Sequence, residues 1–545
     1  MSRSDLTSES PVATADTTSV SPHMNTRALL ALVAGVLLGA PWFDQSLYWT
    51  AWFGAVPLLF ALRGTTLRAA WLLGWLTGAV YFAIATYWII DFVINLRGFS
   101  LPVAVLLGVV FWCYAGLATG LSCLLFRWVS RHLPRWDLLS FPVCMVVLME
   151  IYPLLVGTYY AEAQSRFLPG LQGVALLGVQ GMDMLMMLSG ALLFTLLTDR
   201  GRSQRAGTAL AASVLLAWFA YGFISLQAWD TRMLEWDTRR IGLVQPNDAV
   251  TLAIPEPPKG FSRTYPPELA ATERLAAAGA ELVVWPEARY KGYFDKPSVR
   301  NSYAAVLSRL DIPLILHDSE RAWTNGDYAD YNSLVYLDDR GAQAGVYRKM
   351  LRMPLGEYLP DFFHLPGIGW VTRRFFGDFV RPLQPGTAHK EFRINGMRLL
   401  PKICYEAAFP SFVAEAVGRN GAGKVLLFVS QDNWFGETAQ PFQHASMSVV
   451  RGVENRLPMI HLINNGPSVV SAPNGRITAR TQAFAQSEIV ASMPFSATSG
   501  GSFYSRHPQI VRYLQYGILA MLVGLVLIRR YRDSATRGKR IIQPR

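Results

Sequence analysis

The chain contains 545 residues, of which 51% are hydrophobic, 12% are aromatic and only 16% are charged. This composition excludes a disordered protein, because burial of so much apolar surface offsets the entropy lost on ordering, and it argues against a purely cytosolic enzyme. The formal net charge of +12 does not by itself indicate nucleic-acid binding, since basic residues of membrane proteins collect in cytoplasmic loops. We therefore expect a membrane protein with no nucleic-acid partner.

Eight apolar stretches predict membrane-spanning helices. Residues 1–25 are rich in Ser and Thr and are expected to form a disordered cytoplasmic tail. We expect a membrane domain of seven helices at 26–229, an eighth transmembrane helix at 511–529 and a basic cytoplasmic tail at 530–545. The seven stretches lie at 28–43, 47–62, 69–90, 101–126, 138–160, 173–197 and 206–226. The first two are short for a bilayer about 30 Å thick, which requires about 20 helical residues.

Arginine residues are concentrated in alternate loops between these stretches. The arginine-rich loops contain Arg63 and Arg68, then Arg127, Arg131 and Arg135, and then Arg200, Arg202 and Arg205. Because such loops stay on the cytoplasmic side, seven spans from a cytoplasmic N-terminus place the segment after Leu226 outside. The eighth span returns the chain to the basic tail, so the large polar segment is predicted to be extracytoplasmic.

That polar segment, at 239–495, has the pattern of a globular α/β domain. Helical stretches at 267–280 and 409–422 alternate with short, β-rich apolar runs, which favours a mixed or layered sheet. The runs begin at residues 241, 281, 312, 331, 397, 424 and 459. The segment is long enough to form one large domain.

Three of the predicted strands end in residues that can perform chemistry. Glu287 closes VVWPE, Lys349 closes GVYRK, and Cys404 follows LLPKI. A thiol beside an ammonium and a carboxylate suits nucleophilic catalysis, because the cation lowers the pKa of the thiol and the carboxylate accepts its proton. Histidine is the more usual partner of a catalytic cysteine, and His317 and His444 are candidates for it. Taken singly, each residue is better explained as a surface charge or a buried structural thiol.

Cys404 is the only cysteine of the polar segment. The segment therefore has no internal disulfide, and it shows no Cys/His spacing typical of a metal site. We expect no metal ion.

Four motifs carry a resemblance to a known family. They are WPE at 285–287, RKMLRMPLGEYLP from Arg348, ICYEAAFP from Ile403 and SQDNWFG from Ser430. In this order they resemble the motifs of the nitrilase, or carbon–nitrogen hydrolase, superfamily. With seven spans before the domain and one after it, residues 27–530 resemble the membrane-bound apolipoprotein N-acyltransferase family of that superfamily.

The resemblance implies a fold and a set of site residues. The expected fold is a multi-span α-helical membrane domain with an extracytoplasmic, nitrilase-like α/β domain built as an α-β-β-α sandwich. The family's catalytic triad matches Glu287, Lys349 and Cys404, and it needs no metal and no soluble cofactor. Further family positions, expected to bind substrate or support the triad, match Glu357, Tyr405, Glu406 and Trp434.

The resemblance also implies a reaction. Cys404 would take an acyl chain from a membrane phospholipid as a thioester, with Glu287 as the base and Lys349 stabilising the oxyanion. The acyl chain would then pass to the N-terminal amino group of the diacylglyceryl-cysteine of an apolipoprotein. Such an enzyme is expected as a monomer in the bacterial inner membrane, with the catalytic domain on the periplasmic side.

The chain departs from the family pattern in two places. After WPE it continues ARYKGYF, which puts Arg289 and Lys291 close to the expected base. In the fifth span it reads EIYPL from Glu150, where the family carries E-W-L-R-G. Glu150 and Asp183 are ionisable residues within apolar spans, for which helix packing and lipid recognition are equal alternatives.

Two other classes of function stay open. A membrane-tethered amidase or hydrolase would use the same triad with water as the second nucleophile. An interaction protein without activity would keep the fold, although such proteins usually lose the nucleophile or the base.

Residues 358–379 are expected to form a mobile arm over the active site. The segment interleaves aromatic residues with glycines, and its aromatic rings favour the membrane interface. The alternative is that these rings pack into the core of the domain.

Overall fold

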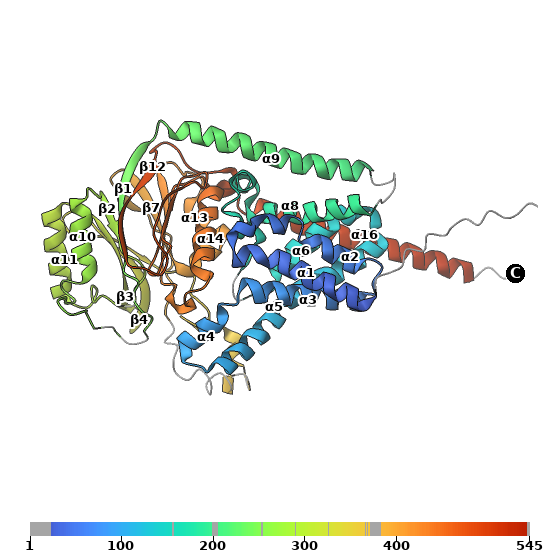
Figure 1. Ribbon diagram of the computed structural model, residues 1–545, viewed down its shortest axis with the longest axis horizontal. Helices are drawn as coiled ribbons and strands as arrows, with labels where there is room; N and C mark the ends of the chain where they lie inside the picture. Colours follow the sequence, from blue (N-terminus) through green and yellow to red (C-terminus); the bar gives the residue numbers. More distant parts are fainter. Residues whose placement is uncertain are drawn as a thin grey trace, which may run out of the picture.

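A computed structural model describes residues 23–154, 157–198, 205–251, 254, 256–288, 290–324, 326–365, 367, 369–370 and 383–541. Figure 1 shows two bodies: a bundle of long helices, and a β-rich domain beside one end of it. Helix α9 (Arg205–Met233) runs along the bundle and is followed by the first strand of the β-rich domain. The last helix, α16 (Ile510–Ile541), returns from that domain to the bundle.

The helical body is built from both ends of the chain. Its other elements are α1 (Met24–Phe43), η1 (Gln45–Trp52), α2 (Ala55–Leu62), α3 (Leu67–Ala85), α4 (Ile89–Arg97), α5 (Leu101–His132), η2 (Pro134–Trp136), α6 (Asp137–Ile151), η3 (Tyr160–Gln164), α7 (Leu168–Leu171), α8 (Val174–Leu197) and α15 (Phe503–Arg506). Six of the described helices, α1, α3, α5, α8, α9 and α16, are long and apolar enough to cross a membrane. The protein is therefore a multi-pass membrane protein, as expected.

The two expected tails differ in what the structure describes. Residues 1–22 of the N-terminal tail lie outside the described residues, so its disorder stays a prediction. Helix α16 continues to Ile541, so most of the basic segment at 530–545 extends the last membrane helix.

Two of the eight apolar stretches form shorter helices than expected. The stretch at 47–62 is divided between η1 and the eight-residue helix α2. The stretch at 138–160 forms the 15-residue helix α6, which ends because Tyr152 precedes Pro153 and adopts an extended conformation. Since neither helix reaches about 20 residues, the count of seven spans before the polar domain stays a prediction.

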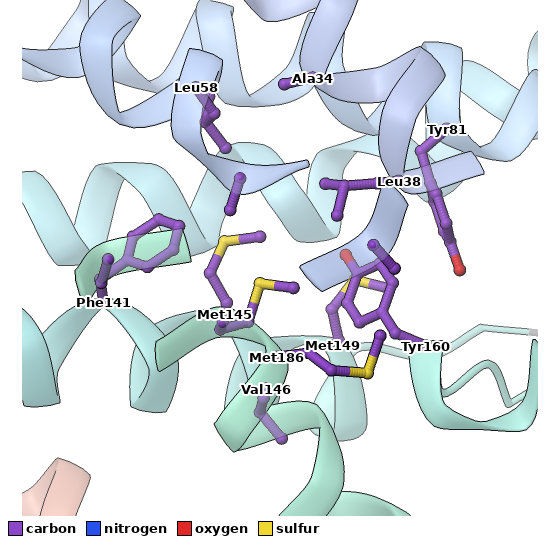
Figure 2. Packing of buried hydrophobic residues seen from close by; sticks show 14 of the residues in the cluster. Ala34, Leu38, Leu58, Tyr81, Phe141, Met145, Val146, Met149, Tyr160 and Met186 are labelled. Carbon is purple, nitrogen blue, oxygen red and sulfur yellow. The ribbon is translucent and has the colours of Figure 1, made fainter. Parts of the chain in front are cut away.

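Small residues and thioethers fill the centre of the helical body. Gly116 of α5 lies so close to α3 that a Cβ there would come within 2.6 Å of the Ala79 backbone nitrogen. Figure 2 shows Leu38, Met145 and Met186, from three different helices, converging in one buried cluster. Close contact through small residues lets helices associate where no hydrophobic effect drives them together.

The β-rich domain contains two six-stranded sheets, with strand orders β12-β1-β2-β3-β4-β5 and β11-β10-β9-β8-β7-β6. The first consists of β1 (Asp237–Gln245), β2 (Leu282–Val284), β3 (Leu314–Thr324), β4 (Asp327–Leu337), β5 (Gln343–Arg348) and β12 (Ser487–Phe495). The second consists of β6 (Phe392–Ile394), β7 (Met397–Ile403), β8 (Lys424–Ser430), β9 (Met459–Ile463), β10 (Val469–Ser471) and β11 (Ile477–Arg480). Short helical turns η5 (Asp361–His364), η6 (Cys404–Ala408) and η7 (Asn433–Phe435) lie in the connections.

The two sheets pack face to face between two layers of helices. Leu243 and Val284 of the first sheet meet Leu399 and Leu427 of the second in one buried cluster. Helices α10 (Pro267–Ala277) and α11 (Pro297–Leu310) cover the first sheet, and α13 (Pro410–Val417) and α14 (Gln440–Asn455) cover the second (Figure 1). The α-β-β-α sandwich expected from the resemblance is confirmed.

Buried charges fix the β-rich domain against the helical body. Arg451 of α14 is fully buried and pairs with Glu162 of η3 at 2.6 Å and with Glu454 at 2.9 Å. Glu454 in turn accepts a hydrogen bond from the backbone nitrogen of Val179 in α8. Because removing one partner would leave an uncompensated buried charge, this cluster holds the two bodies in one relative position.

The two ionisable residues noted within the apolar spans make packing contacts. Glu150 accepts a hydrogen bond from Arg512 of α16 at 2.7 Å. Asp183 accepts hydrogen bonds from the backbone nitrogens of Tyr160 and Ala161. Both carboxylates therefore join helices or cap η3, which accounts for their presence without a lipid ligand.

Candidate active site

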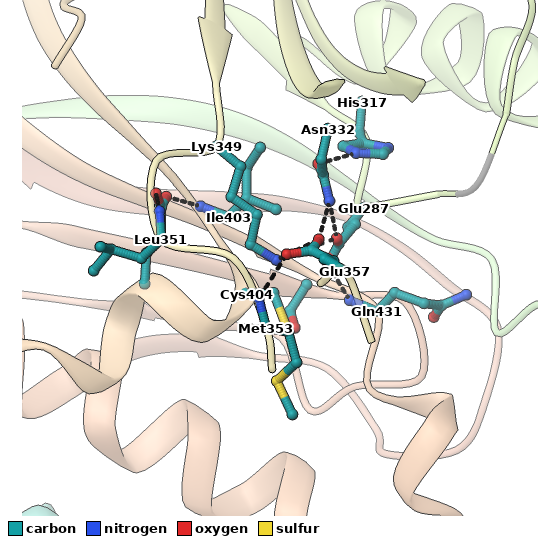
Figure 3. A network of polar contacts seen from close by, with 12 residues as sticks. Glu287, His317, Asn332, Lys349, Leu351, Met353, Glu357, Ile403, Cys404 and Gln431 are labelled. Atoms are coloured by element: carbon teal, nitrogen blue, oxygen red, sulfur yellow. Dashed lines mark hydrogen bonds and ion pairs between the residues drawn. The ribbon is translucent and has the colours of Figure 1, made fainter. Parts of the chain in front are cut away.

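The structure brings the three residues expected at strand ends into one group. Glu287 follows β2, Lys349 follows β5 and Cys404 follows β7. The Lys349 Nζ lies 4.0 Å from Glu287 Oε1, and Figure 3 shows both side chains pointing toward Cys404. Parallel strands β1, β2 and β3 in one sheet, and β7, β8 and β9 in the other, end at the same side of the sandwich. Ligand and catalytic groups gather at the carboxyl ends of such strands.

Lys349 lies between two carboxylates. Its Nζ donates to Glu357 Oε1 at 2.9 Å, and only 3% of its side chain is exposed. Burial alone would lower the pKa of Lys349, but the carboxylates of Glu357 and Glu287 outweigh burial and raise this pKa. The ammonium therefore stays charged at neutral pH and is held in place by Glu357.

An amide and an imidazole orient the two carboxylates. Asn332 donates through Nδ2 to Glu287 Oε1 at 2.8 Å and to Glu357 Oε1 at 2.9 Å (Figure 3). Its carbonyl oxygen faces His317 Nε2, while His317 Nδ1 accepts from the Ala288 backbone nitrogen. Burial lowers the pKa of His317 to about 4, so the ring is neutral and its remaining proton lies on Nε2.

Cys404 has a strained backbone and a protonated thiol. Its φ of +48° is in the left-handed region, which non-glycine residues adopt at a cost of about 1–3 kcal/mol and mainly at functional sites. Burial and the charge of Glu287 raise the pKa of the thiol, and Lys349 opposes them. The resting residue is therefore a thiol, which needs a base to become a nucleophile.

Glu287 has the environment of such a base. Its Oε2 accepts from the Gln431 backbone nitrogen at 3.1 Å, and its Oε1 accepts from Asn332. Burial raises the pKa of Glu287, whereas Lys349 lowers it. A carboxyl group with a raised pKa accepts a proton from a thiol more readily than an ordinary surface glutamate.

Neither candidate histidine is hydrogen-bonded to the thiol. His317 acts on Asn332, as described, and His444 Nε2 lies 3.0 Å from the backbone oxygen of Cys404. The other ring nitrogen of His444 lies 2.9 Å from Asp432, whose charge raises the pKa of the ring despite its burial. His444 therefore orients the backbone of Cys404, and Glu287 is the candidate base for the thiol.

Cys404, Asp432 and His444 also present metal-ligand atoms within 4.8 Å of one another. The Asp432 carboxylate, however, is engaged by the Ser430 hydroxyl and by His444. These groups face each other and the Cys404 backbone, so their arrangement fits a hydrogen-bonded chain.

Glu406 supports the site by joining its two sheets. It is fully buried, and its carboxylate accepts hydrogen bonds from Tyr347 Oη and from the backbone nitrogens of Met350, Leu351 and Ile403 at 2.7–3.1 Å. It thus connects the segment after Lys349 to the strand before Cys404. Its neighbour Tyr405 packs its ring on Phe409 with a centroid separation of 4.8 Å.

A cavity of about 1180 Å³ opens from these residues. The catalytic part of the lining consists of Glu287, Lys349, Glu357, Cys404 and Trp434.

The helical body also contributes to the lining of this cavity, through Phe92 and Leu96 of α4. Phe92 stacks on Phe435 at 5.3 Å, and Asn95 donates to the Trp434 backbone oxygen. The cavity therefore has a polar catalytic end and an apolar wall at the junction of the two bodies.

Of the two cations in the divergent ARYKGYF segment, the structure describes Lys291, which is neutralised. Lys291 forms an ion pair with the buried carboxylate of Glu268, and its backbone nitrogen donates to Asp318 at 2.6 Å. Arg289 lies outside the described residues.

Part of the expected arm at 358–379 also lies outside the described residues, and within the described part Trp370 is 66% exposed. The mobile arm stays a prediction.

Both bodies match family models. Residues 247–499 match the carbon-nitrogen hydrolase family, and residues 34–192 match the N-terminal domain of apolipoprotein N-acyltransferase. In both bodies the chain is similar to the apolipoprotein N-acyltransferase family.

Curated relatives of this family match nearly the whole chain. The apolipoprotein N-acyltransferase of Geobacter metallireducens is 28% identical over 517 residues, which cover 92% of this chain and 95% of the relative. That of Azotobacter vinelandii is 29% identical over 536 residues, covering 94% and 96%. Among solved structures, an amidase from Nesterenkonia sp. is 17% identical with a TM-score of 0.33, covering 51% of this chain and 96% of that one.

Proposed function

We propose that this protein is an N-acyltransferase that moves an acyl chain from a membrane phospholipid to the N-terminal amino group of a diacylglyceryl apolipoprotein. The observation that carries the proposal is the group of Glu287, Lys349 and Cys404 in a cavity that also touches helix α4. A soluble substrate would need no wall from the membrane body. The similarity of both bodies to the apolipoprotein N-acyltransferase family supports the same reaction.

In the first step, Cys404 takes the acyl chain. Glu287 accepts the thiol proton as the sulfur attacks the ester carbonyl carbon of the phospholipid. The Lys349 ammonium stabilises the negative charge that develops on the carbonyl oxygen. When the tetrahedral intermediate collapses, the carbon–oxygen bond breaks, and the departing glycerol oxygen takes the proton back from Glu287. The products are a thioester and a lysophospholipid.

In the second step, the neutral amine of the acceptor attacks the thioester carbonyl. Glu287 accepts a proton from the amine, and Lys349 again stabilises the oxyanion. The carbon–sulfur bond breaks, Cys404 regains a proton from Glu287, and an amide is released. The free enzyme is thereby restored.

The supporting residues act through the triad or the cavity. Glu357 positions the Lys349 ammonium, and Glu406 holds the chain segments that carry Lys349 and Cys404. Trp434 and Tyr405 are proposed to contact substrate near the nucleophile. Anchoring both substrates in the same bilayer confines their reacting groups near the cavity, which favours productive orientation.

The location follows from the loop charges. Arginine-rich loops between alternate spans support a cytoplasmic N-terminus and a β-rich domain on the periplasmic side of the bacterial inner membrane. Reporter fusions after Trp236 should then be extracytoplasmic and fusions after Arg530 cytoplasmic. We propose that the enzyme works as a monomer, since the triad is contributed by one chain.

Product analysis tests the proposed reaction. Purified full-length protein is incubated with phospholipid vesicles and a diacylglyceryl lipopeptide, and the lipid products are separated by mass spectrometry. We expect equal amounts of lysophospholipid and N-acylated lipopeptide, and neither from Cys404→Ala. Free fatty acid in place of the amide would instead identify a membrane-tethered hydrolase, and no lipid product at all would reject both.

A further inference from the structure

A two-stranded ribbon projects from the first sheet beside the active site. Strands β3 and β4 pair along their whole length, from Leu314 with Leu337 to Thr324 with Asp327. Strand β2, however, pairs only with Leu314 and Ile315, and β5 pairs only with 333–337 of β4. The outer half of the β3–β4 pair therefore extends beyond its neighbouring strands (Figure 1).

One face of this ribbon leads outward from the proposed base. Directly paired residues share a face, and so do alternate residues along a strand. Asn332, which binds Glu287, is paired with Ser319 on this face. The next pair outward is Arg321 with Asp330, and the outermost is Trp323 with Tyr328. From the first pair to the last the ribbon rises by about 13 Å, since each strand residue adds about 3.3 Å.

The inner part of this face belongs to the cavity that contains Cys404. Glu320 and Tyr331, which lie on the opposite face of the ribbon, also line the cavity. The cavity therefore extends around the base of the ribbon. The residues of the inner face that line it are His317, Ser319, Arg321, Asp330 and Asn332.

The outer end of the face is an exposed aromatic pair. Trp323 and Tyr328 are each 65% exposed, and their rings meet edge to face at a centroid separation of 4.8 Å. Between them and the catalytic group, Arg321 donates two hydrogen bonds to Asp330, at 2.6 and 3.0 Å. The pairing presents a preorganised surface, because each side chain is held by its cross-strand partner.

The charge of the ribbon distinguishes between two possible occupants. Residues 318–331 contain four acidic side chains and one basic side chain, a formal charge of −3. Three of the four carboxylates are engaged, since Glu320 pairs with Arg348, Asp330 pairs with Arg321, and Asp318 accepts from the backbone nitrogens of Lys291 and Tyr293. Because Arg321, the one basic side chain of this segment, is paired as well, the segment does not offer a cation to an anionic lipid head group. Trp and Tyr are also enriched among the few residues that contribute most of the binding energy at protein interfaces.

We infer that the face of the β3–β4 ribbon binds the polypeptide segment that follows the modified N-terminal residue of the acceptor. The inference rests on the proposed function. When the acceptor amine reaches the thioester on Cys404, its own chain has to leave the cavity. The ribbon face offers a path of about four extended residues, from Ser319 and Asn332 to Trp323 and Tyr328. Peptide residues after the first few would then pack on the aromatic pair.

The test compares acceptors of different length. The double variant Trp323→Ser, Tyr328→Ser is prepared as full-length protein in vesicles, with Trp323→Phe, Tyr328→Phe as the conservative variant. Ile477→Ser, which changes another exposed apolar residue of the same domain, is the control. Thioester formation from phospholipid is measured first, followed by kcat/KM for diacylglyceryl lipopeptides of two and of ten residues.

We expect the double Ser variant to form the thioester at the normal rate and to lose about tenfold in kcat/KM for the ten-residue acceptor only. The Phe variant and the Ile477→Ser control should retain the activity of the unchanged protein. Equal loss for both acceptor lengths would overturn the inference. Slower thioester formation together with weaker vesicle binding would overturn it as well, by showing that the pair contacts the membrane. Absence of any thioester in the unchanged protein would instead refute the proposed function.

Discussion

The two ends of the cavity differ in the side chains that line them and in how those side chains are held. At the catalytic end, each charged group has several partners: Lys349 lies between two carboxylates, and Asn332 bridges Glu287 and Glu357. At the other end, Phe92 and Leu96 of α4 offer only apolar contact. The contrast indicates that the chemical groups are positioned before substrate arrives, while the membrane side of the cavity sets which molecules enter. Substitutions at the two ends should therefore change different kinetic constants.

Removal of the ammonium should have the largest effect. Lys349→Met deletes the group proposed to stabilise the oxyanion and leaves two carboxylates without their cation. We expect thioester formation to slow by a factor of about 100–1000, the usual loss for one oxyanion donor. Rapid quenching and intact-protein mass spectrometry measure this rate. A loss smaller than about fivefold would mean that the oxyanion is stabilised elsewhere.

The pH dependence should identify the base. Burial raises the pKa of Glu287 above that of a free glutamate, so its carboxylate becomes protonated at a higher pH than usual. The rate of thioester formation should fall as the pH drops through this raised pKa, because a protonated carboxyl group cannot accept the thiol proton. Glu287→Gln should lower the rate by a factor of about 100 and abolish this acidic limb. An unchanged acidic limb in that variant would assign it to another group.

The apolar end should affect substrate entry. The double variant Phe92→Ser, Leu96→Ser removes apolar contact from α4 without touching a charged group. We expect KM for the phospholipid to rise by a factor of about 10, corresponding to loss of part of the apolar contact between these two side chains and the lipid, and kcat to change little. Alkylation of Cys404 by a small soluble reagent should proceed at the normal rate. If alkylation slows as much as acyl transfer, α4 supports the fold of the catalytic end.

The smallest effect on catalysis is expected at the divergent segment. Lys291→Met should leave the rate of thioester formation per folded molecule within about twofold, because the ammonium is neutralised by Glu268. The free energy of unfolding should nevertheless fall by about 3 kcal/mol, since Glu268 becomes a buried, unpaired charge. Adding Glu268→Gln to that variant should restore most of the stability. A large kinetic effect with normal stability would instead make Lys291 part of the active site.

Glu287, Lys349 and Cys404 could be predicted because each ends a recognisable strand and because the four ordered motifs that contain or follow them resemble those of a known family. Asn332 lies inside the run YNSLVYLD, where nothing in the local sequence sets it apart from other polar strand residues. Only the register of β4 against β3 brings it to His317 and between two carboxylates. The role of Glu406 also depends on distant backbone groups, although the resemblance to the family made it a candidate.

The layered domain could also be predicted, whereas the lengths of two membrane helices could not. All seven β-rich runs overlap strands, since alternating or continuous apolar runs bounded by turns are a direct consequence of sheet geometry. The three-residue strands β6 and β10 are too short to show a period. In the fifth apolar stretch hydropathy continues past Ile151, but Pro153 ends the helix there. Hydropathy indicates which residues favour an apolar environment, in lipid or in protein, but it does not predict the residue at which a helix ends.

The acyl group on Cys404 is the most direct test of the proposed mechanism. Purified protein is mixed with vesicles of a phospholipid with one known acyl chain, without acceptor, and its intact mass is measured before and after hydroxylamine. The proposed mechanism predicts a mass increase of one acyl group, located on the peptide that contains Cys404, removed by hydroxylamine and absent in Cys404→Ala. Acyl transfer to lipopeptide by Cys404→Ala at the normal rate would contradict it.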